Sequence, residues 1–121
     1  MGRVVHFEIG AKNPEVINKF YQEALGWDIK AWGEGDYWLV MTGPQDTPGI
    51  DGGIIPSGFP QPVINTIAVD SLEDTLARIE AAGGKTVYGP QDIPGVGRHA
   101  YCADPEGTWF GVLQPSGEMN I

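Results

Sequence analysis

One pattern of predicted strands and helices occurs twice in this chain of 121 residues, and this repeat limits the folds open to it. Each copy has a strand, an amphipathic helix that ends at glycine, and three short strands. The copies run from about residue 3 to 58 and from about 60 to 115. Such a repeat usually means two copies of one structural unit. Since one copy alone would expose an apolar sheet face, we expect both to close together in a single domain, residues 1–121.

The first copy opens with an alternating strand over Val4–Ile9, in which His6 and Glu8 share the polar face. Asn13 and Pro14 predict the start of a helix, with Asn as N-cap and Pro in the first turn. Gly26 predicts its end. Three further strands are expected over residues 27–32, 37–42 and 52–56.

The second copy repeats this order. After a strand over residues 63–69, Ser71 predicts a helix N-cap, with an acidic residue three positions on, and Gly83-Gly84 end the helix. Asp104–Gly107 has the composition of a turn. The remaining strands are expected over residues 85–88, 98–103 and 108–114, with residues 89–97 as a loop.

Charge and composition exclude several classes of protein. The formal net charge is −9 with seven Lys and Arg together. Because a nucleic-acid binder needs a basic stripe, we expect neither a nucleic acid nor an anionic membrane as partner. No apolar run approaches the ~18–20 residues of a membrane span, and the N-terminus lacks the pattern of a signal peptide, so a cytoplasmic location is expected. The single cysteine, Cys102, is interpreted as a residue packed in a strand rather than a reactive thiol.

Several segments, taken in order, resemble one known family, the vicinal-oxygen-chelate superfamily of glyoxalases, bleomycin-resistance proteins and dioxygenases. Its first module is similar to Val5–Ile9 and Leu25–Trp27, its second to Val69–Glu73 and Glu80–Gly84, and its terminal turn and strand to Asp104–Val112. The resemblance implies an α+β fold in which two βαβββ modules form an open, barrel-like sheet around a central pocket.

The same resemblance implies where a metal would bind, because active members hold a divalent ion with one side chain from each of four strands. His6 matches the first of these positions. The other three fall on Ile64, with Asn65 beside it, on Gly52–Ile55 and on Gly111, which offer no suitable donor. A metal site needs about three or four protein donors. We therefore expect no metal cofactor, with a divalent ion at a rearranged His6, Glu8 and His99 site as the alternative.

Other side chains are candidates for contact with a ligand. Trp109 shares a strand face with Gly111 and Leu113, which the family directs into the barrel, and aromatic walls suit flat or apolar molecules. Arg98 is a candidate for an anionic group, or for pairing with the plentiful surface carboxylates. His6 and Glu8 are candidate acid–base groups or polar lining residues. The full set of ligand-binding candidates is His6, Glu8, Trp38, Thr66, Arg98, His99 and Trp109.

Two functions remain open from the sequence. The first is a metal-independent protein that binds a small apolar or aromatic molecule, as in the branch of the family that lacks most metal ligands. The second is a lyase or isomerase related to glyoxalase I, or a dioxygenase, that uses a divalent metal or His6 and Glu8 as acid–base groups. In both cases the expected partner is a small molecule, and a homodimer is the expected assembly.

Overall fold

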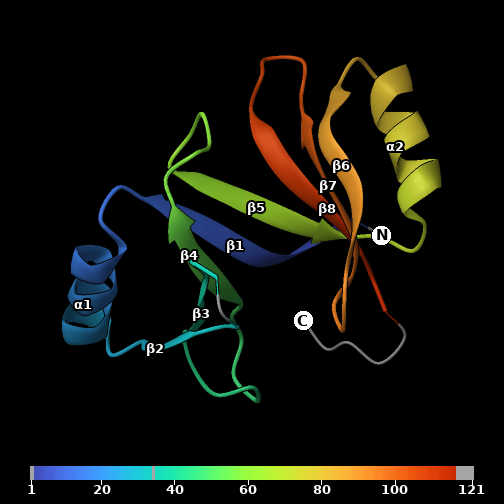
Figure 1. Ribbon diagram of the computed structural model, residues 1–121. Helices are drawn as coiled ribbons and strands as arrows, with labels where there is room; N and C mark the ends of the chain where they lie inside the picture. The colour runs from blue at the N-terminus through green and yellow to red at the C-terminus, as the bar shows by residue number, and fades with distance from the viewer. Residues whose placement is uncertain (1, 34, 117–121) are drawn as a thin grey trace. The chain divides into compact units, whose positions relative to one another are not determined.

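The computed structural model describes residues 2–33 and 35–116, and these contain eight strands and two helices (Figure 1). They form two compact units, the first module (residues 6–63) and the second module (residues 64–116 with residues 2–5). The predicted order of strand, helix and three strands occurs in each, which confirms the mixed α+β class. The elements are β1 (Arg3–Ala11), α1 (Pro14–Leu25), β2 (Asp28–Ala31), β3 (Trp38–Met41), β4 (Asp51–Pro56), β5 (Val63–Ala68), α2 (Leu72–Ala81), β6 (Lys85–Ile93), β7 (Gly97–Ala103) and β8 (Trp109–Pro115).

The strands of the first module lie in the order β2-β3-β4-β1, with β1 parallel to β4 and the other pairs antiparallel. Successive side chains of a strand point to opposite faces. One face is apolar and packs against Ile17 and Tyr21 of α1. The opposite face carries the polar side chains of β1. The buried residues of the apolar core are Ala11, Ile29, Val40 and Ile54.

Helix α1 begins and ends where the sequence predicts, but its N-terminus is held differently. The side chain of Asn13 makes no capping hydrogen bond, so the start depends on Pro14, whose ring presets a helical φ. Gly26 adopts φ 72° and donates its N–H to the Gln22 carbonyl, an ending that favours glycine. Within the described ranges, no helix is long and apolar enough to cross a membrane.

The second module repeats this topology in the order β5-β8-β7-β6, with β5 parallel to β8. Helix α2 lies along β6, β7 and β8 and covers the apolar face of the sheet (Figure 1). Cys102 is fully buried in this core, as predicted. The core consists of Val69, Leu72, Leu76, Ala100, Cys102 and Val112.

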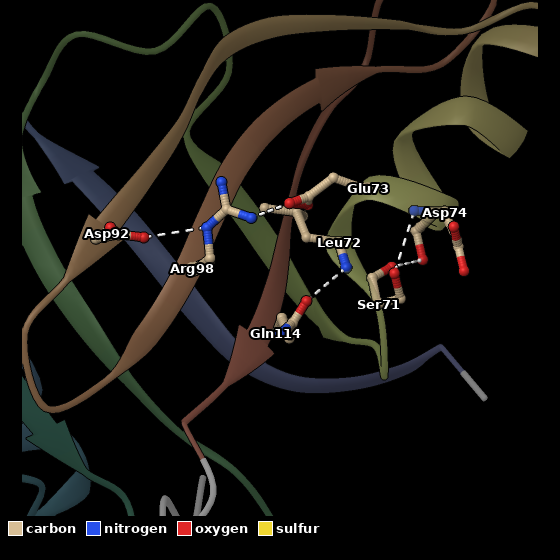
Figure 2. A network of polar contacts seen from close by, with 8 residues as sticks. Ser71, Leu72, Glu73, Asp74, Asp92, Arg98 and Gln114 are labelled. Carbon is tan, nitrogen blue, oxygen red and sulfur yellow. Dashed lines mark hydrogen bonds and ion pairs between the residues drawn. The ribbon is translucent and has the colours of Figure 1, made fainter.

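Two side chains satisfy backbone groups at the start of α2 (Figure 2). Ser71 accepts a hydrogen bond from the backbone N–H of Asp74, which confirms the predicted N-cap. The Gln114 side-chain oxygen, on β8, accepts from the N–H of Leu72 at 2.8 Å. The second bond ties the helix to a strand that follows it by some forty residues, so the helix start depends on tertiary structure as well as on local sequence.

The prediction of a loop over residues 89–97 is wrong. Strand β6 continues to Ile93 and pairs with β7, leaving only a tight turn between them. The ladder is irregular between Thr86 and Tyr88 and again between Tyr88 and Gln91. Because β6 is an edge strand of its module, Pro90 costs no hydrogen bond to a further neighbour.

Candidate functional site

The face of the first module that α1 leaves uncovered carries His6 and Glu8 on β1. In the parallel ladder His6 lies beside Asp51 and Glu8 beside Gly53, both on β4. Aligned residues on neighbouring strands share a face, so these four positions form one polar strip. Tyr37, just before β3, brings its hydroxyl group to this strip.

The Tyr37 hydroxyl links the side chains of His6 and Glu8 through two hydrogen bonds. The Tyr37 hydroxyl lies 3.0 Å from His6 Nε2 and also bonds the carboxylate of Glu8. Glu8 is only 8% exposed, and a buried carboxylate requires such partners. We call this set the His6–Tyr37–Glu8 cluster.

Gly53 provides the space for the Tyr37 hydroxyl. A Cβ atom at position 53 would overlap the hydroxyl and the ring, and its three nearest heavy atoms all belong to Tyr37. Gly52, one residue earlier, gives the same freedom on the apolar face, where a Cβ would lie 2.6 Å from the ring of Phe7. Both glycines therefore permit aromatic rings to pack directly on the backbone of β4.

Burial changes the proton affinities within the cluster. Desolvation lowers the pKa of His6 below its usual value, although the negative charge of Asp51 opposes this effect. Desolvation also raises the pKa of Tyr37 strongly, and the Glu8 carboxylate raises it further through its charge and its hydrogen bond. At neutral pH the cluster therefore combines a neutral imidazole with a protonated phenol.

The corresponding face of the second module carries three residues that were predicted from the sequence, Thr66 on β5, His99 on β7 and Trp109 on β8. Thr66 and His99 are 3% and 6% exposed. Tyr101, which was not predicted from the sequence, joins them. Its ring meets the His99 ring edge-on at 4.5 Å and lies 6.0 Å from the Trp109 ring. We call these four residues the His99 cluster.

Gly111 lies beneath this cluster, where the resemblance places the last metal ligand. A Cβ atom there would lie 2.8 Å from His99 Nε2 and 3.1 Å from the Thr66 hydroxyl oxygen. The space that a ligating side chain would need at position 111 is therefore taken by the side chains of two neighbouring strands.

The residues of this chain do not fit the metal site of the family. Ile64 is fully buried and has no donor atom, Gly53 lies under the Tyr37 ring, and Gly111 lies under His99 and Thr66. Among the described residues, no three His, Cys, Asp or Glu side chains lie close enough together to hold a metal ion. We therefore derive no chemistry through a metal.

Two sequence candidates lie on other faces. Trp38 packs with the apolar core of the first module, in register with Ile54. Arg98 points away from His99, because adjacent residues of β7 alternate between faces. Its guanidinium pairs with Glu73 of α2 and, at 3.0 Å, with Asp92 of β6 (Figure 2). An anionic ligand would have to compete with both carboxylates for Arg98.

Tyr37 could not have been found from local sequence. It lies 31 residues from His6 and immediately before β3, so only the strand order brings the two together. The sequence does contain a pattern that indicates Tyr101. It lies two positions after His99 in a predicted strand and therefore on the same face.

Comparison with known proteins identifies the family of this chain. Residues 3–112 match the family model described as the Glyoxalase/Bleomycin resistance protein/Dioxygenase superfamily. The chain is 30% identical over 118 residues to a candidate glyoxylase, CFP32, of Mycobacterium bovis and Mycobacterium tuberculosis, a match covering 95% of this chain and 45% of each relative. It thus spans about half the length of these curated relatives. An anthracycline biosynthesis protein of Streptomyces peucetius, DnrV, is 42% identical over 53 residues, covering 42% of this chain and 19% of that protein.

Solved structures share the fold at low sequence identity. Methylmalonyl-CoA epimerase from Mycobacterium tuberculosis superposes with a TM-score of 0.71 at 13% identity, covering 95% of this chain and 89% of that one. A superfamily member from Vibrio splendidus 12B01 superposes with a TM-score of 0.66 at 18% identity, covering 96% of this chain and all of that one. At these identities the likeness concerns the fold alone.

Proposed function

Because this chain belongs to the Glyoxalase/Bleomycin resistance protein/Dioxygenase superfamily, we propose that it binds a small apolar or aromatic molecule through its side chains, without a metal ion. The observation that carries this proposal is the space above Gly111, where His99 and Thr66 stand in place of a ligating side chain. Hydrogen-bonding groups thus occupy positions where the family's active members are expected to hold an ion.

The aromatic side chains of the His99 cluster support this class of ligand. Tyr101 and Trp109 lie with tilted rings on the face that α2 leaves uncovered. Binding sites for small organic molecules are mostly apolar and aromatic, with a few polar groups that set orientation. Stacking on such rings contributes about 0.5–1.5 kcal/mol per pair beyond the area buried. The similarity to an anthracycline biosynthesis protein favours an aromatic ligand as well.

Metal analysis and ligand binding together test the proposal. We expect tag-free protein to contain well under one equivalent of metal after incubation with Zn²⁺, Ni²⁺, Mn²⁺ or Fe²⁺ and desalting. We also expect aromatic probes to bind with micromolar to millimolar affinity, and Trp109→Leu to weaken them, whereas Trp27→Phe, in the core on the α1 side, leaves them unchanged. Stoichiometric metal that is lost in His6→Ala would overturn the proposal.

A second candidate function is proton transfer by His6 without a metal, as in a lyase, isomerase or epimerase. The observation favouring it is the lowered pKa of His6, which leaves a neutral imidazole able to accept a proton at neutral pH. A carbon acid would lose a proton to the ring and regain it on another face or atom. Solvent deuterium exchange into candidate thioester and hemithioacetal substrates tests this, with loss of exchange in His6→Gln as the expected result.

We further propose a homodimer that forms through α1, whose outer side carries Val16, Phe20 and Leu25 at 57–59% exposure. A shallow apolar groove runs between Val16, Phe20 and Ala24, flanked by Lys19 and Glu23. These two opposite charges make the surface self-complementary, as a two-fold interface requires. Light scattering on Phe20→Glu, with Glu15→Gln as control, tests the proposed dimer. We expect a dimer that dissociates only in the Phe20→Glu variant, and a monomeric wild type would refute the proposal.

The cytoplasmic location stays a prediction from the sequence.

A further inference from the structure

We propose that Tyr37 is a positioning residue that sets the tautomer of His6, and that the first module therefore selects ligands that offer a hydrogen-bond donor to the His6 ring. This inference rests on the proposed binding function and deepens it, because it names a property of the ligand. Its basis is the position of the Tyr37 hydroxyl between two polar side chains, Glu8 and His6.

The Tyr37 hydroxyl has one proton and two polar neighbours. A carboxylate can only accept a hydrogen bond, so the proton of Tyr37 points to Glu8. The lone pairs of the same oxygen then face His6 Nε2, 3.0 Å away. Two acceptors at this distance would repel each other, so Nε2 carries a hydrogen and donates it to Tyr37. A neutral imidazole with its hydrogen on Nε2 has a bare Nδ1.

Several contacts hold Tyr37 in this position. The backbone N–H of Trp32 donates to the Tyr37 carbonyl at 2.8 Å, which fixes the backbone across the turn before β3. The Trp32 ring meets the Tyr37 ring edge-on at 5.8 Å. Below the ring, Gly53 allows the hydroxyl to reach the backbone of β4. The phenol is thus oriented by its surroundings, and it in turn orients His6.

A bare Nδ1 determines what His6 can recognise. It accepts a hydrogen bond and cannot donate one, so a ligand that meets it must present an O–H or N–H group. An analogue whose hydroxyl is capped by a methyl group has no donor, and it leaves Nδ1 of the partly buried His6 ring without a hydrogen bond from the ligand. Losses of this kind amount to roughly tenfold or more in affinity.

Nuclear magnetic resonance can test the tautomer without any ligand. Long-range ¹H–¹⁵N spectra of the whole chain distinguish the protonated from the bare ring nitrogen of each of the two histidines. We expect wild-type His6 near pH 7.5 to be almost entirely protonated on Nε2, and Tyr37→Phe to show a mixture of tautomers. Tyr88→Phe, which removes an exposed hydroxyl of the second module, is the matched control. A hydrogen on Nδ1 in the wild type overturns the proposal even if Tyr37→Phe fails to fold.

Two matched probes test the selection of a donor. We expect 2-naphthol to bind the wild type at least about tenfold more tightly than 2-methoxynaphthalene, and this ratio to fall to about two in Tyr37→Phe. Equal binding of the two probes to the wild type overturns the selection of a donor. If neither probe binds, the aromatic ligand class of the proposed function fails, while the tautomer spectra still decide the role of Tyr37.

Discussion

Gly53→Ala is the substitution that tests the geometry of the candidate site most directly. The added methyl group would occupy the position of the Tyr37 hydroxyl, so the ring must leave the polar strip. Tyr37 then loses one hydrogen bond to a carboxylate and one to a neutral imidazole. Such bonds contribute about 1.5–3 and about 0.5–1.5 kcal/mol respectively, so the expected loss of unfolding free energy is about 2–4.5 kcal/mol.

Thermal unfolding by circular dichroism measures this loss. For a domain of this length we expect Tm to fall by roughly 10 °C. The control is Gly58→Ala, because a Cβ at position 58 meets nothing nearer than the Pro56 carbonyl at 4.0 Å and should leave Tm almost unchanged. In a Tyr37→Ala background the clash is absent, so Gly53→Ala should cost less than about 0.5 kcal/mol there. The reasoning is refuted if Gly53→Ala matches the control, or if its cost is equal in both backgrounds.

Three further measurements examine the cluster and the second module. The pKa of His6 is lowered in the folded state, so the unfolded chain binds a proton more readily. The free energy of unfolding, measured in urea, should therefore decrease as pH falls below about 6.5, and the decrease should be smaller in His6→Gln. The pKa of Tyr37 is raised in the folded state, so its contribution to the free energy of unfolding is complete below about pH 10 and is lost as pH rises beyond that value. Ultraviolet titration should show that Tyr37 ionises at a higher pH in the native protein than in Gly53→Ala. Leu72→Ala opens a cavity at a fully buried core position and should lower the free energy of unfolding by about 3–5 kcal/mol. Gln114→Ala removes only the hydrogen bond to the Leu72 N–H and should lower it by about 1 kcal/mol. Denaturation of both variants checks this order.

Local sequence patterns were sufficient for most of the secondary structure. Alternation of polar and apolar side chains placed His6 and Glu8 on one face of a strand, and Ser71, Pro14 and Gly26 marked helix ends through their own backbone or side-chain preferences. The strand β6 was predicted too short because Gly89 and Pro90 resemble a loop. Such residues are tolerated on an edge strand, and only the strand order shows which strand is at an edge.

The candidate site, like the secondary structure, was predictable from the sequence only in part. The resemblance predicted His6 at the first ligand position and Gly111 at a position that lacks its ligand, because both follow from residue types at known places in the chain. The open barrel and the central pocket that it implies stay predictions.

Tertiary structure alone decided which side chains meet. The pairing of β1 with β4 and of β3 with β4 brings Tyr37 to Glu8 and, across 31 residues, to His6. The pairing of β8 with β5 and β7 places Thr66 and His99 above Gly111. The same registers put Trp38 in the core and Arg98 between two carboxylates. The sequence by itself determined the repeat, the faces of the strands and the family. The partners across the strands depend on register and on side-chain reach, and no local pattern of residues encodes these.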